Sequence, residues 1–266
     1  MDPVIFSIGS FSLQYYGLMY LVAFSVVYGL AVYRIRREPG FGIDTEQLQG
    51  LMVAMILGVL IGGRLGYVIF YNLSYYMRHP LEIILPFDIS NGFRFTGISG
   101  MSFHGGVICV ILASWIFVRR NKIDFFAMVD LIIPCIPLGY TFGRLGNFIN
   151  GELYGRVTTR LIGMHFPTAP GSKLRHPSQL YEAFFEGIVL FLVLWFLKSR
   201  VKTRGVMLSL YLMGYGLLRF FIEYTRQPDD HLGFVLFQLS MGQVLCLVMI
   251  VAGAGLLIFL RRRRES

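Results

Sequence analysis

The sequence predicts an all-α, polytopic membrane protein with about seven transmembrane helices. Its composition is 55% hydrophobic and only 15% charged, whereas soluble domains carry about 25% charged residues. Apolar runs of about 20 residues, the length that crosses a bilayer as a helix, recur along the chain. These runs do not alternate polar and apolar residues, so they do not indicate a membrane β-barrel. Residues 1–266 are therefore expected to form a single integral membrane domain.

Seven segments have the length and apolar composition of a spanning helix. The short connections on one side carry most of the lysine and arginine residues, including the terminal run 261–264. Because such residues accumulate in cytoplasmic loops, we expect the N-terminus outside and the C-terminus in the cytoplasm. The fourth span should be kinked where Pro134 and Pro137 each remove a helix hydrogen bond. The expected spans are 14–33, 48–71, 101–118, 125–142, 180–197, 206–225 and 239–260.

The outer connections are the more elaborate ones. Residues 72–100 and 143–179 are too long for simple turns, and loops of that length are often functional. We therefore expect these two outer-face insertions to carry the chemistry. The net charge of +9 is attributed to topology and anionic lipids rather than to a nucleic acid partner. All three cysteines lie in apolar runs without metal-type spacing, so no metal site is expected.

The stretch Gly143–Gly155 concentrates polar groups directly after an apolar run. Ionisable groups at membrane depth are costly and usually functional, and the intervening glycines let the backbone bend sharply or approach a ligand closely. The alternative is a polar helix exit capped by glycine. The candidate substrate-binding residues of this stretch are Arg144, Asn147, Asn150, Glu152 and Gly155.

Two further candidates lie near the starts of spans. Tyr16 begins the first span, where a tyrosine can also be an ordinary interfacial residue. His104 begins the third span beside Gly105 and Gly106, which leave room for a ligand; the alternative is a hydrogen-bonded interfacial histidine. In the second span, Arg64 stands among glycines that favour close helix packing, and it must find a polar partner.

The sixth span ends with a third group of charges. Arg219, Glu223 and Arg226 are spaced i, i+4 and i+7, which places them on one helix face. In water this spacing would be read as a surface salt-bridge ladder. Near the end of a membrane span such a ladder is costly, so we favour a functional role.

The stretch Gly143–Gly155 resembles the signature of the bacterial prolipoprotein diacylglyceryl transferases, and further motifs resemble this family in the same order along the chain. These motifs are Tyr15–Leu18, Gly62–Tyr67, Ser102–Gly106, His176–Glu182, Arg219–Pro228 and Ser240–Gln243. The resemblance implies transfer of the sn-1,2-diacylglyceryl group from phosphatidylglycerol to the lipobox cysteine of a prolipoprotein, with release of glycerol 1-phosphate. This reaction is the first step of lipoprotein maturation, and it would require no cofactor.

The family reaction suggests roles for the candidate residues. Negative charge grows on the phosphate as the carbon–oxygen bond breaks, and arginine binds phosphate oxygens in pairs. We therefore expect Arg144 and Arg219 to clamp the phosphate. His104 is expected to assist deprotonation of the acceptor thiol; Tyr16 or the surroundings of the substrate are the alternatives.

The remaining polar candidates are expected to hold the head group or to orient the arginines. Tyr16 and the polar residues of Gly143–Gly155 would position the lipid, while Glu223 would hold Arg219 or Arg226. The implied partners are phosphatidylglycerol, other membrane lipids and the lipobox segment of a signal peptide. The implied location is the bacterial inner membrane, with the active site towards the periplasm.

Two rival classes use similar features. A secondary transporter would also place arginines and a kinked helix in the membrane, but it should show an internal repeat, and the sequence contains no second copy of the signature. A membrane scaffold would use the outer loops for docking, but it would not need charges at the outer ends of two spans. Release of glycerol phosphate from phosphatidylglycerol distinguishes the enzyme from both.

Overall fold

The computed structural model divides the chain into two helical units. Unit 1 consists of Met1–Gly40 and Phe126–Ser266, and unit 2 consists of Phe41–Phe125. The structure describes residues 4–8, 11–38, 40–83, 87–88, 94–95, 100–227, 234–236 and 239–265. The expected outer insertion 72–100 therefore lies partly outside the described residues.

Each of the seven expected spans overlaps a helix. Within the described residues, six helical stretches are long and apolar enough to cross a membrane, and α4 (Phe103–Arg120) occupies the third expected span. An all-α polytopic architecture is thus confirmed, whereas the number of crossings and the orientation of the termini stay predictions. The six stretches are Tyr15–Arg37, Thr45–Tyr71, Phe125–Ile149, Ser178–Leu197, Val206–Thr225 and Met241–Arg263.

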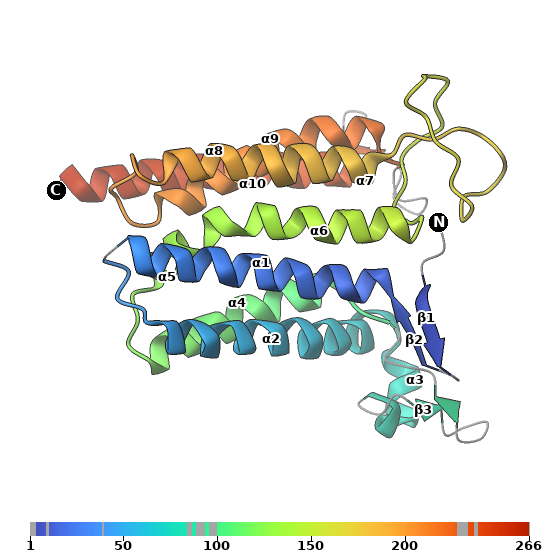
Figure 1. The fold of residues 1–266 in the computed structure, drawn as a ribbon, viewed down its shortest axis with the longest axis horizontal. Coiled ribbons are helices and arrows are strands. Elements are labelled where there is room, and N and C mark those ends of the chain that lie inside the picture. The colour runs from blue at the N-terminus through green and yellow to red at the C-terminus, as the bar shows by residue number, and fades with distance from the viewer. Residues whose placement is uncertain are drawn as a thin grey trace. The chain divides into compact units, whose positions relative to one another are not determined.

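Unit 1 contains most of the helices and two short hairpins. In Figure 1, α6 runs alongside α1, while α8, α9 and α10 lie together on the other side of α6. The strands β1 (Val4–Ile8) and β2 (Phe11–Gln14) pair antiparallel, as do β5 (Phe234–Leu236) and β6 (Leu239–Ser240). The helical elements are α1 (Tyr15–Arg37), α5 (Phe125–Ile132), η2 (Ile133–Cys135), α6 (Ile136–Ile149), α7 (Ser178–Tyr181), η3 (Glu182–Val189), α8 (Leu190–Leu197), α9 (Val206–Ile222), η4 (Glu223–Thr225) and α10 (Met241–Glu265).

The fourth expected span is interrupted where its prolines predict. Pro134 lies in η2, a 3-10 turn that separates α5 from α6, and Pro137 lies in the first turn of α6. Just before this break, the Asp130 carboxylate accepts hydrogen bonds from the backbone amides of Gly205 (2.7 Å) and Met207 (3.3 Å). Asp130 therefore caps the start of α9 with the side chain of a neighbouring helix.

An ion-pair cluster closes the C-terminal end of α1. The buried Arg34 bonds the backbone carbonyl of Leu131 at 2.7 Å and the Glu38 carboxylate at 2.7 Å, and Lys198 also pairs with Glu38. Burial raises the pKa of Glu38, but the hydrogen bonds and charges of Arg34 and Lys198 outweigh it and hold that pKa below its usual value. This cluster ties α1 to α5 and α8 at one end of unit 1.

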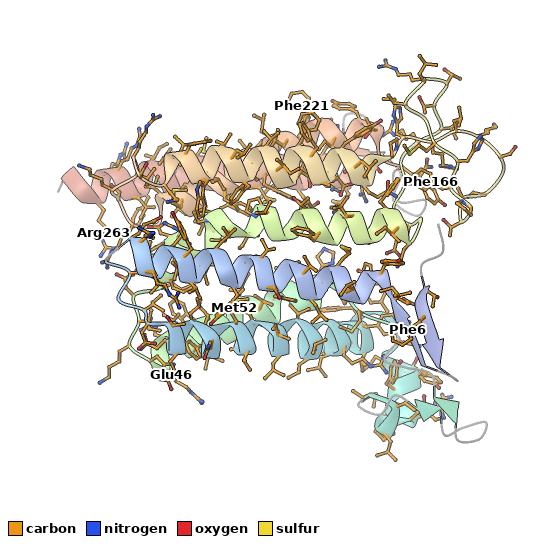
Figure 2. The ribbon with its side chains drawn as sticks, viewed as in Figure 1. Phe6, Glu46, Met52, Phe166, Phe221 and Arg263 are labelled. Atoms are coloured by element: carbon orange, nitrogen blue, oxygen red, sulfur yellow. The ribbon has the colours of Figure 1, made fainter. Side chains whose placement is uncertain are left out.

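The loop from 150 to 177 gathers at the other end of α6. Figure 1 shows it projecting where α6 ends and α7 begins. Phe166 is buried inside the loop, with its ring 6.1 Å from Phe148 and 5.4 Å from Tyr154. Figure 2 shows Phe166 within this loop and Phe221 on the outside of α9, where it is 62% exposed. The loop therefore packs around a buried aromatic side chain of its own, while α9 exposes an apolar side chain on its outer side.

Unit 2 pairs two helices through glycine. An added Cβ on Gly66 would lie 2.7 Å from the Gly105 Cα, and one on Gly62 would collide with Cys109. The close packing expected from the small residues is confirmed, because α2 and α4 touch backbone to backbone. Besides α4, this unit contains α2 (Thr45–Tyr71), α3 (Leu73–Arg78), η1 (Pro80–Ile83), β3 (Phe87–Asp88) and β4 (Arg94–Phe95).

Arg64 finds its partners within the same unit. Its guanidinium donates to the backbone carbonyls of Ile83 (3.0 Å) and Glu82 (2.5 Å) and lies 4.9 Å from the ring centre of Tyr76. These contacts fix the turn after α3 against α2. Arg64 therefore has a structural role in unit 2.

Candidate active site

The last turns of α6 deliver the first part of the site. Arg144 donates from Nη1 to Asn147 Oδ1 at 3.1 Å, and Asn147 Nδ2 donates in turn to Glu152 Oε1 at 2.8 Å. The guanidinium of Arg144 also lies 4.7 Å from the ring centre of Tyr140. Because residues i+3 and i+4 share a helix face, the spacing of 140, 144 and 147 aligns these groups along one side of α6. The expected grouping of Arg144, Asn147 and Glu152 is thus observed.

The Arg144 guanidinium pairs with a carboxylate from another helix. Its Nε lies 2.8 Å from Glu182 Oε2. The same carboxylate receives Arg219 Nη1 at 3.0 Å and Arg226 Nη1 at 2.6 Å. Glu182 has no exposed surface, so three cations, from α6, from α9 and from the residue that follows η4, converge on one buried anion.

The segment that carries Glu182 has unusual helix geometry. Residues Glu182–Val189 form a π-helix between α7 and α8, and π-helical turns occur frequently at functional sites. Glu186 lies one turn further on and is also buried. The Tyr140 hydroxyl donates to Glu186 Oε2 at 2.5 Å and lies 3.2 Å from Glu182 Oε2. Tyr140 therefore links the two glutamates to α6.

The C-terminal end of α9 supplies the remaining charges. Glu223 Oε2 lies 3.3 Å from Arg219 Nε and 3.4 Å from Arg226 Nε, so the expected one-face grouping of these three residues is observed. Ser240 Oγ donates to Glu223 Oε1 at 3.3 Å. An added Cβ on Gly242 would lie 2.6 Å from this carboxylate. Contacts from Ser240 and Gly242, at the start of α10, therefore hold Glu223 next to both arginines.

Gly155 lies where the loop meets the end of α9. Its amide donates to the His176 carbonyl at 2.8 Å, and it forms an antiparallel bridge with Arg226. An added Cβ would collide with the Thr225 carbonyl oxygen. The backbone φ of Gly155 is not positive, in contrast to Gly151 with φ of 67°. Glycine is therefore needed at position 155 for close approach rather than for an unusual turn.

Among the described residues, buried side-chain oxygens without a hydrogen-bond partner lie in and beside the loop from 150 to 177. Within the described residues, Asn150 Oδ1 and Gln179 Oε1 are buried and accept no hydrogen bond. Gln179 Nε2 donates to the Glu152 carbonyl at 2.5 Å, which fixes that side chain. Leaving a buried acceptor unpaired costs about 1–3 kcal/mol. Such atoms are therefore suited to receive hydroxyl groups of a ligand.

Tyr16 and His104 occupy different units. Tyr16 packs against α6, 3.4 Å from the ideal Cβ position of Gly146, and its hydroxyl is 3.0 Å from that of Tyr20. Tyr16 therefore lies against α6, which carries the start of the stretch Gly143–Gly155, and its role in the site stays a prediction. His104 is exposed and lies at the start of α4 in unit 2, where the buried Ser102 caps the helix by accepting from Gly105 N at 3.3 Å. Its role in the site stays a prediction.

Sequence reasoning assigned no role to the residues on which the arginines converge. Glu182 and Glu186 lie inside the expected span 180–197, and Tyr140 lies inside another. Two carboxylates at i and i+4 in an apolar run are the signal that could have found them, because such groups are costly in a membrane unless they are functional. Their shared contacts with arginines from α6 and α9 depend on packing that the sequence does not show.

The arrangement is suited to binding an anion at the end of a helical bundle. Between 15% and 18% of the side-chain surface of each of the three arginines is exposed to solvent. Within the described residues, the closest ion-pair contacts of these arginines use their Nε and Nη1 atoms. Guanidinium groups with spare donors bind phosphate or carboxylate oxygens strongly.

The fold and the site thus define a polytopic helical membrane protein with a buried arginine–carboxylate cluster that can bind an anion. The family model described as prolipoprotein diacylglyceryl transferase matches residues 3–259. The chain therefore belongs to the prolipoprotein diacylglyceryl transferase family.

Relatives from three bacteria match the chain over nearly its whole length, and each is named phosphatidylglycerol–prolipoprotein diacylglyceryl transferase. The relative from Chlorobaculum tepidum is 55% identical over 100% of this chain and 92% of its own length. The relative from Bordetella avium is 47% identical over 98% of this chain and 96% of its own. The relative from Coxiella burnetii strain RSA 331 is 46% identical over 100% of this chain and 97% of its own.

Proposed function

We propose that the chain transfers the sn-1,2-diacylglyceryl group from phosphatidylglycerol to the thiol of the lipobox cysteine in a prolipoprotein. The product is a thioether-linked lipid on the protein, and glycerol 1-phosphate is released. Family membership and the names of the relatives support this activity. The structural observation that carries it is the convergence of Arg144, Arg219 and Arg226 on one buried carboxylate.

The reaction needs a leaving group and a proton acceptor. The cysteine sulfur forms a bond to the glycerol carbon that carries the phosphate, while the bond from that carbon to the phosphate oxygen breaks. The electron pair of the broken bond stays on the phosphate, and the thiol proton passes to a base and then to water. Only a few per cent of a free thiol is ionised at neutral pH, so a base within reach assists the attack. We assign this base role to His104.

Arg144 and Arg219 act as the phosphate clamp. Their guanidinium groups meet at Glu182 through Arg144 Nε and Arg219 Nη1, and their other donors would bind the phosphate. Fixed cations aimed at the phosphate stabilise the charge that grows as the leaving group departs, and they require no reorganisation at that moment. Arg226 contributes a third positive charge, and Glu223 forms ion pairs with both Arg226 and Arg219.

The stretch Gly143–Gly155 positions the glycerol head group of phosphatidylglycerol. Asn150 offers a buried acceptor for a head-group hydroxyl. Asn147 and Glu152 orient Arg144 through their chain of hydrogen bonds. Gly155 lets the loop backbone reach the end of α9, and Tyr16 lines the side of α6. These contacts support a substrate-binding role for each residue.

We further propose that the protein resides in the bacterial inner membrane with the site towards the periplasm. The N-terminus would then lie outside and the C-terminus in the cytoplasm, as the distribution of basic residues suggests. The insertions 72–100 and 143–179 would both lie on the outer face of a single integral membrane domain. The lipobox segment of a signal peptide would approach from this side, and the lipid would enter from the surrounding bilayer.

The decisive experiment combines purified protein, phosphatidylglycerol and a lipobox peptide, and it measures glycerol phosphate release and peptide lipidation. Arg144→Lys keeps the charge but loses the planar fork, so kcat/KM should fall about 100-fold. Arg119→Lys is the matched control, because within the described residues the Arg119 guanidinium packs on the Trp115 ring, at 4.4 Å, in unit 2. Wild-type rates in Arg144→Lys would refute the clamp, and absence of glycerol phosphate release by the wild type would refute the activity.

A further inference from the structure

Glu182 is the anion on which the three site arginines converge, yet the proposed reaction gives it no chemical task. Its carboxylate lies within 3.0 Å of nitrogens from Arg144, Arg219 and Arg226, and it is fully buried. The other two carboxylates of the cluster reach fewer arginines. Glu223 contacts two, at 3.3 and 3.4 Å, and Glu186 contacts only Arg219, at 3.6 Å.

We propose that Glu182 is a positioning residue that holds the three arginines together and sets the net charge of the phosphate site. This inference rests on the proposed function. Glu182 makes its closest contacts to Arg144 Nε, Arg219 Nη1 and Arg226 Nη1, and not to the Nη2 atoms of these arginines. A phosphate can therefore bind to these arginines without displacing the glutamate.

The charge of the site decides how tightly substrate and product are held. A phosphodiester such as phosphatidylglycerol carries one negative charge, whereas a phosphate monoester with its second pKa near 6 carries nearly two at neutral pH. The formal charges of the three arginines and of Glu182, Glu186 and Glu223 cancel. Without Glu182 the site would be net positive and would attract the product more strongly than the substrate, because Coulomb attraction scales with the product of the charges. Slow product release limits many enzymes. Glu182 offsets one positive charge and so favours release of glycerol 1-phosphate.

Two substitutions separate charge from geometry at this position. Glu182→Gln removes the charge but keeps the size and one acceptor oxygen. We expect kcat to fall about tenfold, KM for phosphatidylglycerol not to rise, and the inhibition constant of glycerol 1-phosphate to fall about tenfold. Glu182→Asp keeps the charge but reaches less far. The shorter side chain should hold the three arginines less firmly, so KM for phosphatidylglycerol should rise. Product inhibition by glycerol 1-phosphate should be no stronger than in the wild type.

Glu38→Gln is the matched control. Glu38 also pairs with two cations, Arg34 and Lys198, but it lies at the other end of α1 from Tyr16, ~33 Å away along a helix of this length. Neither kcat nor the inhibition constant should change in this variant. A general effect of removing a glutamate that pairs with two or more cations would appear in both Gln variants. An effect on the phosphate site would appear only at position 182.

Direct binding to the wild type provides a test that needs no variant. Calorimetry should show that glycerol 1-phosphate and its methyl ester, a monoanion, bind within about threefold of each other, since Glu182 lowers the positive charge of the site that would favour the dianion. Binding of the dianion more than about tenfold tighter would overturn the inference, as would unchanged or weaker product inhibition in Glu182→Gln. If the wild type fails to release glycerol phosphate, the proposed function is wrong, while these binding measurements still decide the role of Glu182.

Discussion

Replacing Gly155 by alanine would place a methyl group in the contact between the signature loop and the end of α9. The new Cβ would lie 2.8 Å from His176 Cβ and 2.9 Å from the His176 carbonyl oxygen, and it would collide with the Thr225 carbonyl oxygen. Two of these neighbours are backbone atoms, which cannot turn away as a side chain can. The loop and the end of α9 must therefore separate.

The distance by which the loop and the end of α9 separate determines how far the activity of Gly155→Ala falls. The contact to His176 Cβ has to open from 2.8 Å to at least the 3.4 Å of ordinary van der Waals contact, and Thr225 must move further. Arg226 follows Thr225 directly, so its guanidinium is carried away from Glu182. A misplacement of about 1 Å costs on the order of 100-fold in rate. Overpacking of this kind also costs about 1–3 kcal/mol of stability.

Gly143→Ala is the matched control, because nothing lies within 4 Å of its Cβ position at the other end of the same signature. We expect kcat/KM for lipidation of a lipobox peptide to fall about 100-fold in Gly155→Ala and to stay near the wild-type value in Gly143→Ala. Thermal unfolding in detergent would check that both variants remain folded. Full activity in Gly155→Ala would show that the loop does not set the position of Arg226.

Three further substitutions test other parts of the chain. The pKa of Glu38 is lowered by its two basic partners, so its stabilisation is present above the unfolded pKa and lost as pH falls through the folded pKa. Glu38→Gln should therefore lower Tm at neutral pH, and the difference should vanish in acid. Gly105→Ala would place a Cβ 2.8 Å from Gly66 Cα and should lower the free energy of unfolding by about 1–3 kcal/mol, whereas Gly106→Ala, with its nearest neighbour at 3.6 Å, should change it little. His104→Asn should lower lipidation rates from pH 6 to 9 by about 100-fold, the usual contribution of a general base, and most activity retained over this range would move the base role elsewhere.

Local patterns in the sequence were sufficient for the helices and for groups on one helix. The prolines at 134 and 137 predicted the break between α5 and α6, since each removes a hydrogen bond wherever the helix packs. The ladder of Arg219, Glu223 and Arg226 followed from helical spacing alone. These features depend on residues close in sequence. Their geometry is therefore set mainly by local structure.

The partner of Arg144 could not be predicted in the same way. Its ion pair with Glu182 joins residues on different helices, so it depends on how α6 packs against the π-helical segment. That packing requires Gly187, where an added Cβ would collide with the Thr141 hydroxyl. A single small residue thus permits the contact that brings the two charges together. Small residues permit close approach between many helix pairs, so their presence does not identify which pair forms.

The buried carboxylates also explain how three arginines can be stable in an empty site. Uncompensated cations in apolar surroundings carry a large desolvation cost, and removing one partner of a buried ion pair costs about 3–5 kcal/mol. Glu182, Glu186 and Glu223 offset that cost before any lipid arrives. A cluster neutralised only by phosphate would be unstable between turnovers. Carboxylates that neutralise the arginines hold them in place before the lipid binds. The remaining guanidinium donors can then stabilise the charge that develops on the reacting phosphate.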